Sequence, residues 1–297
     1  MSTQYTFTDP AKLYADIDPQ SQDAKEPGLD ADLTPKAALG EDTYVGSDRL
    51  KGRKALITGA DSGIGAATAI AFAREGASVA MSYLPEEKVD ADRIAGILRD
   101  AGATVVQIPG DLRERDYART LVKEAVDGLG GLDIVVNNGG KQIFNEDVTT
   151  LTDEQFDDTF KTNVYAMFWI CKEAVPHLAP GSTIINTTSI QAYSPAPILV
   201  DYASTKATIN TFTKALGQQL APKGIRVNAV APGPIWTPLQ VTDGQPDEKV
   251  DEFGEETPLG RMGQPAELAP AYVYLASAES SYVIGETLNV NGGMPTP

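Results

Sequence analysis

Three glycines between an apolar segment and a helical segment constrain this chain more than any other feature. The apolar residues 54–58 lead into Gly59, Gly63 and Gly65, and residues 64–75 have the composition of a helix. Gly59 permits a tight strand-to-helix turn, Gly63 lets a ligand approach the backbone, and Gly65 allows close packing of helix on strand. Because the first-turn N–H groups of such a helix bind phosphate oxygens, the junction predicts a dinucleotide site.

Short apolar runs alternate with longer amphipathic runs from residue 54 onward. This alternation predicts right-handed βαβ units, and hence a parallel sheet with helices on both faces. We expect one α/β domain of the doubly wound Rossmann type with about seven strands, because 297 residues are too few for two such domains. The expected strands are Lys54–Thr58, Ser78–Ser82, Thr104–Pro109, Asp133–Asn137, Ser182–Thr187, Arg226–Ala231 and Thr287–Val290.

Two segments depart from this pattern. Residues 1–50 contain ten acidic residues, four basic residues and four prolines without sustained periodicity. They predict an irregular extension that wraps the domain formed by 51–297, wraps a partner subunit, or stays partly mobile. Residues 241–257 contain seven acidic residues and one lysine. This part of the chain, near 240–258, is interpreted either as a lid over a site or as a solvated insertion.

Composition excludes several classes of protein. The net charge of −17 disfavours binding to nucleic acid. No uninterrupted apolar stretch reaches the roughly 18 residues of a membrane span, and the N-terminus does not resemble a secretory signal. A lone cysteine, Cys171, excludes an intrachain disulfide and fits a reducing compartment, so we expect a cytoplasmic protein. No Cys/His cluster predicts a metal site.

A second group of polar residues predicts catalysis. Tyr202 and Lys206 are four residues apart and therefore share one face of a helix. Ser189 lies thirteen residues before Tyr202, just past an expected strand, and parallel sheets place their sites at the carboxyl ends of strands. Asn163 lies inside a long helical stretch, where asparagine is disfavoured, so its amide is expected to have a specific task.

Together these motifs resemble the short-chain dehydrogenase/reductase family. Residues 58–65 match its T-G-x-x-x-G-I-G signature, and Asp111 matches an aspartate that the family places beside adenine. Residues 137–140 match its N-N-A-G motif, with Gly139 where alanine is usual, and residues 232–237 match a P-G-x-x-x-T stretch that lies along the nicotinamide. The similarity extends over roughly residues 50–297, and it implies a nicotinamide-dependent oxidoreductase.

The resemblance also implies a role for each polar residue. Tyr202 would be the general acid in reduction and the base in oxidation, and Ser189 would hydrogen-bond the substrate oxygen. Lys206 would hold the ribose and lower the phenol pKa, which is about 10 in a free tyrosine. Asn163 would hold a water that links Lys206 to solvent.

The expected dinucleotide contacts come from the glycine loop, the ends of the strands that follow it, and the Tyr202 helix. These residues are Gly59, Asp61, Ser62, Gly63, Ile64, Gly65, Ser82, Tyr83, Asp111, Leu112, Asn138, Gly139, Tyr202, Lys206, Pro232, Gly233, Ile235 and Thr237. The second strand ends without an acid and Ser82 could donate to a 2′-phosphate, which favours NADP. NAD stays the alternative, since the glycine loop has no arginine or lysine and Glu86 and Glu87 are near.

The substrate contacts are expected at Ser189, Gln191, Tyr193 and Trp236. The extension and residues 82–87 resemble a bacterial subgroup of general stress proteins and aldehyde or sugar-alcohol dehydrogenases, which implies a small aldehyde, ketone, sugar or polyol. A reductase of acyl groups in lipid metabolism and a non-catalytic dinucleotide sensor stay open as alternatives. The family is usually tetrameric, so a homotetramer that pairs the helices beginning near Thr152 and Tyr202 is expected.

Overall fold

One parallel sheet organises the chain. The computed structural model describes residues 3–22 and 24–296, and in it seven strands pair in the order β3-β2-β1-β4-β5-β6-β7, every neighbouring pair being parallel. The strands are β1 (Lys54–Thr58), β2 (Ser78–Tyr83), β3 (Val105–Pro109), β4 (Ile134–Asn137), β5 (Thr183–Thr187), β6 (Arg226–Pro232) and β7 (Thr287–Val290). The predicted α/β fold with seven strands is confirmed, and each strand agrees with its predicted bounds to within one residue.

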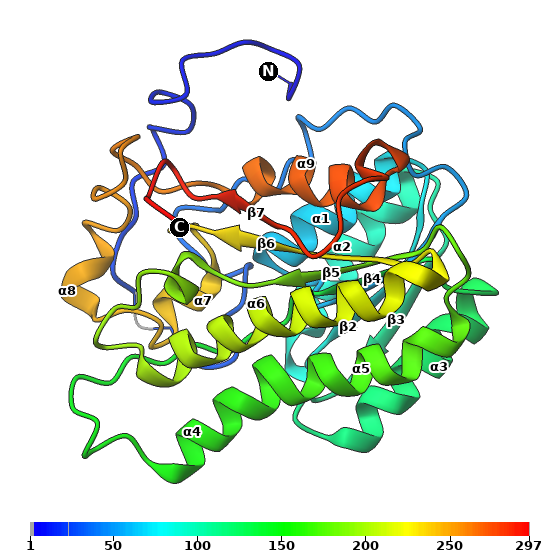
Figure 1. The fold of residues 1–297 in the computed structure, drawn as a ribbon. Helices are drawn as coiled ribbons and strands as arrows, with labels where there is room; N and C mark the ends of the chain where they lie inside the picture. The colour runs from blue at the N-terminus through cyan, green and yellow to red at the C-terminus, as the bar shows by residue number, and fades with distance from the viewer. Residues whose placement is uncertain (1–2, 23, 297) are drawn as a thin grey trace.

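Helices cover both faces of the sheet (Figure 1). One face carries α1 (Gly63–Arg74), α2 (Lys88–Asp100) and α9 (Pro265–Ala276). The other carries α3 (Arg115–Leu129), α4 (Asp153–Phe160), α5 (Ala166–Ala174) and α6 (Val200–Leu220). The short helices α7 (Pro238–Val241) and α8 (Asp247–Val250) lie at the edge toward which the strands point.

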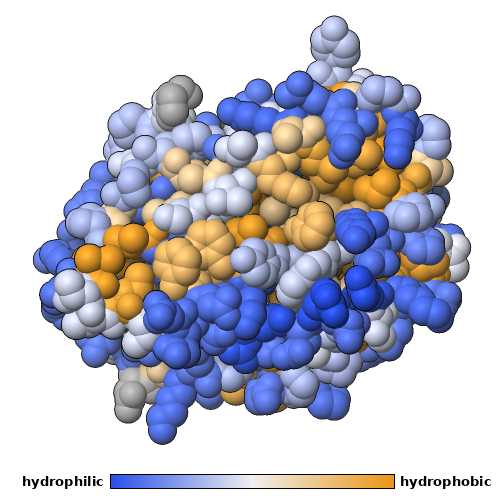
Figure 2. Space-filling view, turned by 60° about the horizontal axis from the view of Figure 1, so that its bottom comes forward, coloured by the Kyte–Doolittle hydropathy of each residue, from blue (hydrophilic) through white to orange (hydrophobic). Residues whose placement is uncertain are grey.

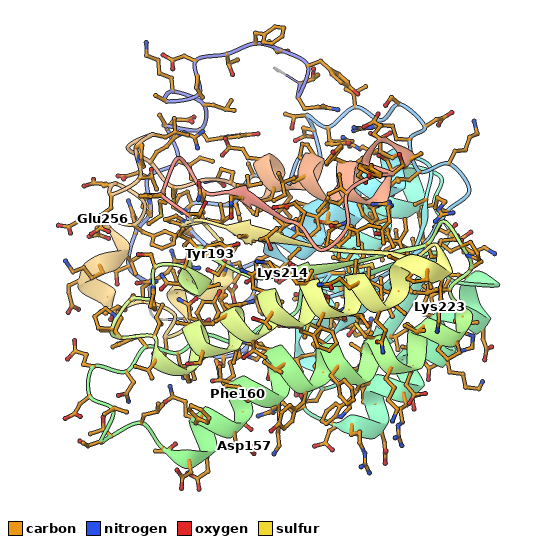
Figure 3. All side chains as sticks on the ribbon, in the orientation of Figure 1. Asp157, Phe160, Tyr193, Lys214, Lys223 and Glu256 are labelled. Carbon is orange, nitrogen blue, oxygen red and sulfur yellow. The ribbon has the colours of Figure 1, made fainter. Side chains whose placement is uncertain are left out.

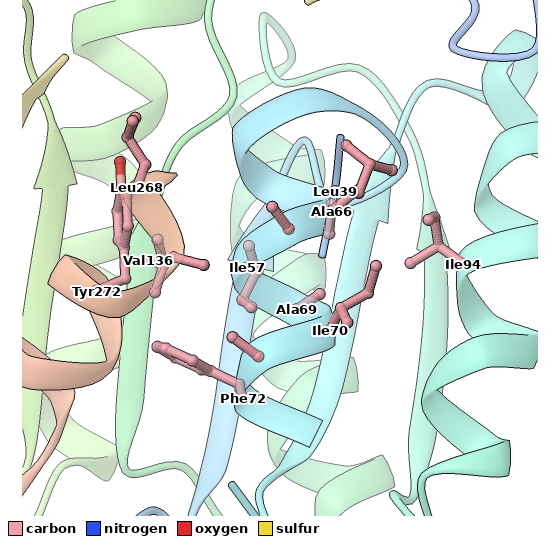
Figure 4. Close-up of a cluster of buried hydrophobic side chains, with 14 of the residues drawn as sticks. Leu39, Ile57, Ala66, Ala69, Ile70, Phe72, Ile94, Val136, Leu268 and Tyr272 are labelled. Atoms are coloured by element: carbon pink, nitrogen blue, oxygen red, sulfur yellow. The ribbon is translucent and has the colours of Figure 1, made fainter. Parts of the chain in front are cut away.

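The core consists of two apolar clusters, one on each face of the sheet. Figure 4 shows the cluster on the face that carries α1, α2 and α9. In it, Ile57 of β1 and Val136 of β4 face Phe72 of α1 and Tyr272 of α9. Because both faces of these strands are buried, they consist of continuous apolar runs without polar alternation. Leu39 of the N-terminal extension inserts into the same cluster.

The N-terminal extension forms no helix or strand within residues 3–22 and 24–50, and yet its second half is firmly packed. The carboxylate of Glu75, at the end of α1, accepts hydrogen bonds from Ser47 N (2.8 Å), Arg49 N (3.0 Å) and Tyr44 Oη (2.7 Å). Gly46 passes so close to α1 that a β-carbon there would lie 1.8 Å from Arg74 O. Residues 29–50 therefore lie on the helices of their own chain.

The strand order reverses between β1 and β4, which leaves a crevice at the carboxyl ends of these two strands. The glycine loop follows β1 and the residues Asn138–Gly140 follow β4, so both border this crevice. Separately, no helix within the described part of the chain is long and apolar enough to span a membrane.

Candidate active site

A continuous cavity of about 1190 Å³ runs along the carboxyl edge of the sheet. Its glycine-loop end is lined by Asp61, Ser82 and Glu87, and its Tyr202 end is lined by Ser189, Tyr202 and Lys206. The volume exceeds that of most single-ligand pockets, so it accommodates a dinucleotide together with a small second molecule. Predicted residues that line it are Gly59, Asp61, Ser62, Gly63, Ile64, Ser82, Tyr83, Asp111, Leu112, Asn138, Gly139, Ser189, Gln191, Tyr202, Lys206, Pro232, Gly233, Ile235 and Thr237.

The glycine loop fits the pyrophosphate of a dinucleotide. Gly59 and Gly63 have φ of +59° and +50°, a region that favours glycine. A β-carbon at Gly63 would lie 2.9 Å from Thr237 Cγ2. Ser62 makes no side-chain bond to α1, so the first-turn N–H groups stay available to a ligand. Gly65 lies outside the cavity wall, because a β-carbon there would meet Gly59 O at 1.7 Å, so it serves helix packing.

The loop after β4 is bonded to the glycine loop. Asn138 Nδ2 donates to the carbonyls of Thr58 and Gly59, both at 3.2 Å, and Thr58 Oγ1 accepts from Gly139 N at 2.9 Å. The departure at Gly139 from the family's alanine has a steric counterpart, because a β-carbon there would lie 2.7 Å from Leu112 Cδ1. Leu112 thus occupies the space that an alanine methyl would take.

The Tyr202 end brings three predicted catalytic groups together. Lys206 Nζ donates to Thr187 O (3.0 Å) and lies 5.2 Å from the centre of the Tyr202 ring. Ser189 Oγ accepts from Gln191 N (3.1 Å), which leaves the hydroxyl proton free to donate. All three side chains are buried in the cavity wall, as the sequence predicted from the i, i+4 spacing and the strand end.

Asn163 lies in a π-helical segment, Lys161–Tyr165, that interrupts the helix between α4 and α5. Such π-bulges are frequent at functional sites. Its amide is bonded on both sides to the backbone of Lys141, with Oδ1 accepting from Lys141 N (2.7 Å) and Nδ2 donating to Lys141 O (2.9 Å). A β-carbon at Gly140 would meet Asn163 Oδ1 at 3.4 Å and Lys206 Nζ at 3.6 Å, so both side chains face Gly140.

Burial sets the protonation of the Tyr202 end. It raises the pKa of Tyr202 to about 12, against a lowering contribution from Ser189, and it lowers the pKa of Lys206 to about 8. The sequence-based expectation that Lys206 lowers the phenol pKa is therefore not met in this structure. The reason is geometric, because the ammonium lies beside the ring and is bonded to Thr187 O.

Two residues expected to contact the cofactor have additional partners. Burial alone would raise the pKa of Asp111, but hydrogen bonds from the side chain and backbone of Arg113 hold it below its ordinary value. Ser82 Oγ lies 2.9 Å from Tyr117 Oη, and that phenol donates to Ile108 O at 2.8 Å. Because the tyrosine proton is used for Ile108, Ser82 must donate its own proton to Tyr117.

Two of the four residues expected to contact the substrate, Tyr193 and Trp236, do not line the cavity. Trp236 is fully buried outside the cavity wall, where its indole Nε1 donates to Pro35 O at 2.8 Å and anchors the N-terminal extension. Tyr193 lies at the same end of the molecule as Glu256 (Figure 3), but it does not line the cavity. The backbone alternates sides along residues 235–237, so Ile235 and Thr237 face the cavity and Trp236 faces the core.

Sequence reasoning missed the residues that cover the cavity. Residues 26–28 of the extension belong to its wall, and Lys141 Nζ binds both carboxylate oxygens of Glu26 at 2.6 and 2.7 Å. A β-carbon at Gly28 would lie 2.7 Å from Thr242 Cγ2. We name residues 26–28 the strap. Its acidic, proline-containing sequence indicates only irregular chain, so no local signal could have placed it here.

No group of three or more histidine, cysteine, aspartate or glutamate side chains within residues 3–22 and 24–296 is arranged to hold a metal ion.

Comparison with known proteins gives one family. A family model described as enoyl-(acyl carrier protein) reductase matches residues 59–295. The chain is 55% identical to the uncharacterized oxidoreductase YghA of Escherichia coli (strain K12), over 96% of this chain and 97% of that protein. It is 41% identical to the glucose and ribitol dehydrogenase of Daucus carota, over 93% of this chain and 96% of that protein.

Solved structures agree with these relatives. A short-chain dehydrogenase from Burkholderia cenocepacia J2315, in complex with NADP, superposes with a TM-score of 0.77 at 30% identity, covering 82% of this chain and 98% of that one. A 3-ketoacyl-(acyl-carrier-protein) reductase from Brucella melitensis, complexed with NADH, gives a TM-score of 0.75 at 33% identity with the same coverage. This chain belongs to the short-chain dehydrogenase/reductase family.

Proposed function

We propose that the chain transfers hydride between a nicotinamide dinucleotide and a small polar carbonyl or alcohol compound. One observation carries the proposal. Ser189, Tyr202 and Lys206 meet at one end of a cavity whose other end is a glycine loop at a helix N-terminus. Phosphate-binding amides and a proton donor thus share one cavity, as a hydride transfer with protonation of the substrate oxygen requires.

The side chains at the Tyr202 end provide the proton chemistry. When bound, the dinucleotide supplies or accepts the hydride at the substrate carbon. In reduction the Tyr202 phenol gives its proton to the carbonyl oxygen, and Ser189 donates a hydrogen bond to the same oxygen as negative charge develops. Lys206 uses one N–H on Thr187 O, which leaves its other donors for the ribose hydroxyls.

Asn163 would act through the backbone of Lys141. Its two bonds to that backbone fix the loop beside Lys206 and leave room next to Gly140 for a water that returns the proton to Tyr202 through Lys206. Burial raises the pKa of Tyr202 to about 12, which keeps the phenol protonated at neutral pH, as a proton donor in reduction requires.

The Tyr202 end fits a small, uncharged, polar substrate. Its wall contains the amide side chains of Gln142, Gln191, Gln240 and Gln245. Glu252, Glu255 and Glu256 stand where the wall reaches the acidic segment that follows α8. Carboxylates there repel anionic carriers of acyl groups, and the glutamines offer donors and acceptors to hydroxyls. The similarity to a glucose and ribitol dehydrogenase supports a sugar, polyol or small aldehyde.

The cofactor is a nicotinamide dinucleotide, and related proteins were solved with NADP and with NADH. The sequence-based preference for NADP depended on Ser82 as a donor to a 2′-phosphate. Since Ser82 donates to Tyr117, that support for NADP is lost.

We further propose a homotetramer whose contacts include the α4–α6 face. Figure 2 looks onto this face and shows a band of apolar side chains across it. Phe156, Tyr165 and Phe168 are 42%, 45% and 46% exposed here. These aromatic side chains lie along the continuous helical run from α4 to α5, and large aromatic side chains exposed in this way are typical of a subunit interface. Sedimentation of the purified chain tests the assembly.

The strap and the segment near 240–258 are proposed to form a lid over the cavity. Gly28 packs against α7, and Ser21 N donates to Asp251 Oδ1 at 3.0 Å, so the extension and the acidic segment contact each other. The lid would exclude water from the Tyr202 end while hydride is transferred.

The proposed function is tested by following dinucleotide oxidation at 340 nm with NADH and NADPH, against a panel of aldehydes, ketones and sugars. Turnover of a small polar carbonyl that disappears in Tyr202→Phe supports it. Dinucleotide binding without turnover of any panel member, in either direction, contradicts it and favours a sensor.

A further inference from the structure

Four carboxyl groups gather around the glycine loop, and two of them, Asp61 and Glu87, line the cavity wall. Asp61 comes from the glycine loop, Glu87 from the turn Pro85–Glu87, Asp90 from α2 and Asp30 from the N-terminal extension. Asp61 interacts electrostatically with Asp30, Asp90 and Glu87, which places the four in one cluster. Asp61, Asp90 and Asp30 are almost fully buried, at 1%, 1% and 4% exposure.

Two of these carboxylates have structural partners. Asp90 accepts from the N–H groups of Asp30 (2.6 Å) and Ala31 (3.0 Å), and Asp30 pairs with Arg93 at 2.6 Å. Asp61 Oδ2 and Asp30 Oδ1 are both buried without a hydrogen-bond partner among the described residues, but of the two side chains only Asp61 belongs to the cavity wall. A buried carboxylate oxygen without a donor is rare and costly, and a ligand hydroxyl in the cavity would satisfy it.

No positive charge in the described cavity wall is free to balance these acids. Its cationic side chains are Arg113, Lys141, Lys206 and Lys249. Arg113 binds Asp111 and Asp158, Lys141 binds Glu26, and Lys206 lies at the Tyr202 end. Lys249 belongs to α8 and lies 3.6 Å from Glu252. A 2′-phosphate, which carries about two negative charges, is ordinarily accommodated by an arginine or lysine.

Ser82 and Glu87 border the same part of the wall, and neither is a cation that could neutralise a phosphate. The Ser82 hydroxyl donates to Tyr117. One carboxylate oxygen of Glu87 accepts from Leu84 N at 2.7 Å, which fixes the side chain in the turn after β2. This end of the cavity therefore presents carboxyl oxygens and no free cation to a ligand.

We infer that Asp61, supported by Glu87, makes the site select the 2′-hydroxyl of NAD(H) against the 2′-phosphate of NADP(H). The inference rests on the proposed function, since it concerns the dinucleotide of that site, and it reverses the preference predicted from the sequence. Asp61 Oδ2 accepts from a ribose hydroxyl, whereas a 2′-phosphate would bring about two negative charges into a wall where no free cation balances them.

The protonation of the pair agrees with this geometry. Burial, with repulsion from neighbouring acids, raises the pKa of Asp61 and of Glu87. Negative charge is thus already unfavourable at this place before any ligand binds. A hydrogen bond from a ribose hydroxyl stabilises negative charge on these carboxyl groups, whereas a phosphate adds further negative charge beside them.

Equilibrium binding to the purified full-length chain tests the inference without turnover. NADH and NADPH are titrated by nicotinamide fluorescence, and ADP and adenosine 2′,5′-bisphosphate by calorimetry, because these fragments report on the glycine-loop end alone. We expect NADH to bind at least about tenfold more tightly than NADPH. We likewise expect ADP to bind more tightly than adenosine 2′,5′-bisphosphate. In the double variant Asp61→Asn/Glu87→Gln, the ratio of the NADPH dissociation constant to the NADH dissociation constant should fall to about threefold or less.

Glu114→Gln is the matched control. Glu114 is exposed and does not line the cavity, so its replacement changes the net charge equally per residue without altering the Asp61–Glu87 pair. The ratio should stay close to that of the unmodified chain. Equal or tighter binding of NADPH, or a ratio that the double variant leaves unchanged, would overturn the inference and leave the proposed function intact. Failure of every dinucleotide to bind would overturn both.

Discussion

The two ends of the cavity are built in different ways. At the Tyr202 end, Lys206 and Ser189 each bond a backbone group, and Asn163 binds the backbone of Lys141 twice. At the glycine-loop end, the carboxylates of Asp61 and Glu87 lie together and Asp61 Oδ2 has no partner among the described residues. The comparison teaches that directional hydrogen bonds fix geometry where chemistry occurs, whereas charge governs selection where the ligand is only held.

The largest effect is expected at the Tyr202 end. Tyr202→Phe removes the proton donor and keeps the ring, so turnover should fall about 10²–10⁴-fold while the dissociation constant of the dinucleotide changes less than about threefold. Steady-state rates and fluorescence titration measure the two quantities. Tyr193→Phe is the matched control, because Tyr193 does not line the cavity, and it should retain activity. Equal losses of turnover in Tyr202→Phe and Tyr193→Phe would contradict the role of Tyr202 as the proton donor.

A smaller effect is expected for Asn163. Asn163→Ala removes both bonds to Lys141, so kcat should fall about tenfold to a hundredfold with little change in KM. If the residue supports return of the proton to Tyr202 in reduction, the loss should depend on pH and shrink toward low pH, where solvent supplies the proton more easily. A rate loss that is equal at every pH would assign Asn163 a purely structural role.

The carboxyl groups at the glycine-loop end should make the free energy of unfolding depend on pH. Burial raises the pKa of Asp61, beside Asp30, Glu87 and Asp90 with Arg93 and Lys36 as the nearby cations. The folded state therefore holds protons that the unfolded state has released above a pH of about 4, and stability falls as pH rises from there through the neutral range.

Asp61→Asn cannot ionise and should flatten that decline. We expect a gain of about 1 kcal/mol or more near pH 8, or roughly 2–4 °C in Tm, and less gain near pH 5. Thermal unfolding of the ligand-free chain at both pH values measures it. A parallel shift at the two pH values would mean that Asp61 is not the titrating group.

The smallest effect is expected at the strap. The Glu26–Lys141 pair is partly exposed, at 46% and 16%, so it contributes modestly. Glu26→Gln should accelerate dinucleotide release about twofold to fivefold, and the effect should vanish at high salt, where surface pairs are screened. Stopped-flow displacement measures the rate. Because Lys141 also binds Asn163, a loss of kcat without faster release would place the effect at the Tyr202 end.

The sequence predicts the Tyr202 end better than the glycine-loop end, for a physical reason. Tyr202 and Lys206 lie on one helix, and Ser189 follows a strand, so local spacing determines where they point. The cluster of Asp30, Asp61, Glu87 and Asp90 comes from four separate segments, and Asp30 belongs to an extension without regular structure. No local pattern predicts which of these acids meet.

Trp236 and Ser82 show the same limit at the level of single side chains. Trp236 follows the P-G turn at a position that suggests a substrate contact, and only the packed extension shows that its indole binds Pro35. Ser82 was expected to donate to a ligand, and the partner that takes its proton, Tyr117, lies on α3. Both differences from the sequence-based expectation arise from tertiary contacts between residues far apart in the sequence.

The central claim is that Tyr202 protonates a substrate carbonyl that receives hydride from a nicotinamide dinucleotide. It is tested most directly by supplying a small polar aldehyde together with reduced dinucleotide that is deuterated at nicotinamide C4. Each C4 stereoisomer is used in turn, and the deuterium content of the alcohol product is measured by mass spectrometry. We predict that one stereoisomer gives an alcohol carrying one deuterium on the former carbonyl carbon, and that Tyr202→Phe forms almost none. Product without deuterium from either stereoisomer, or undiminished transfer in Tyr202→Phe, would contradict the account.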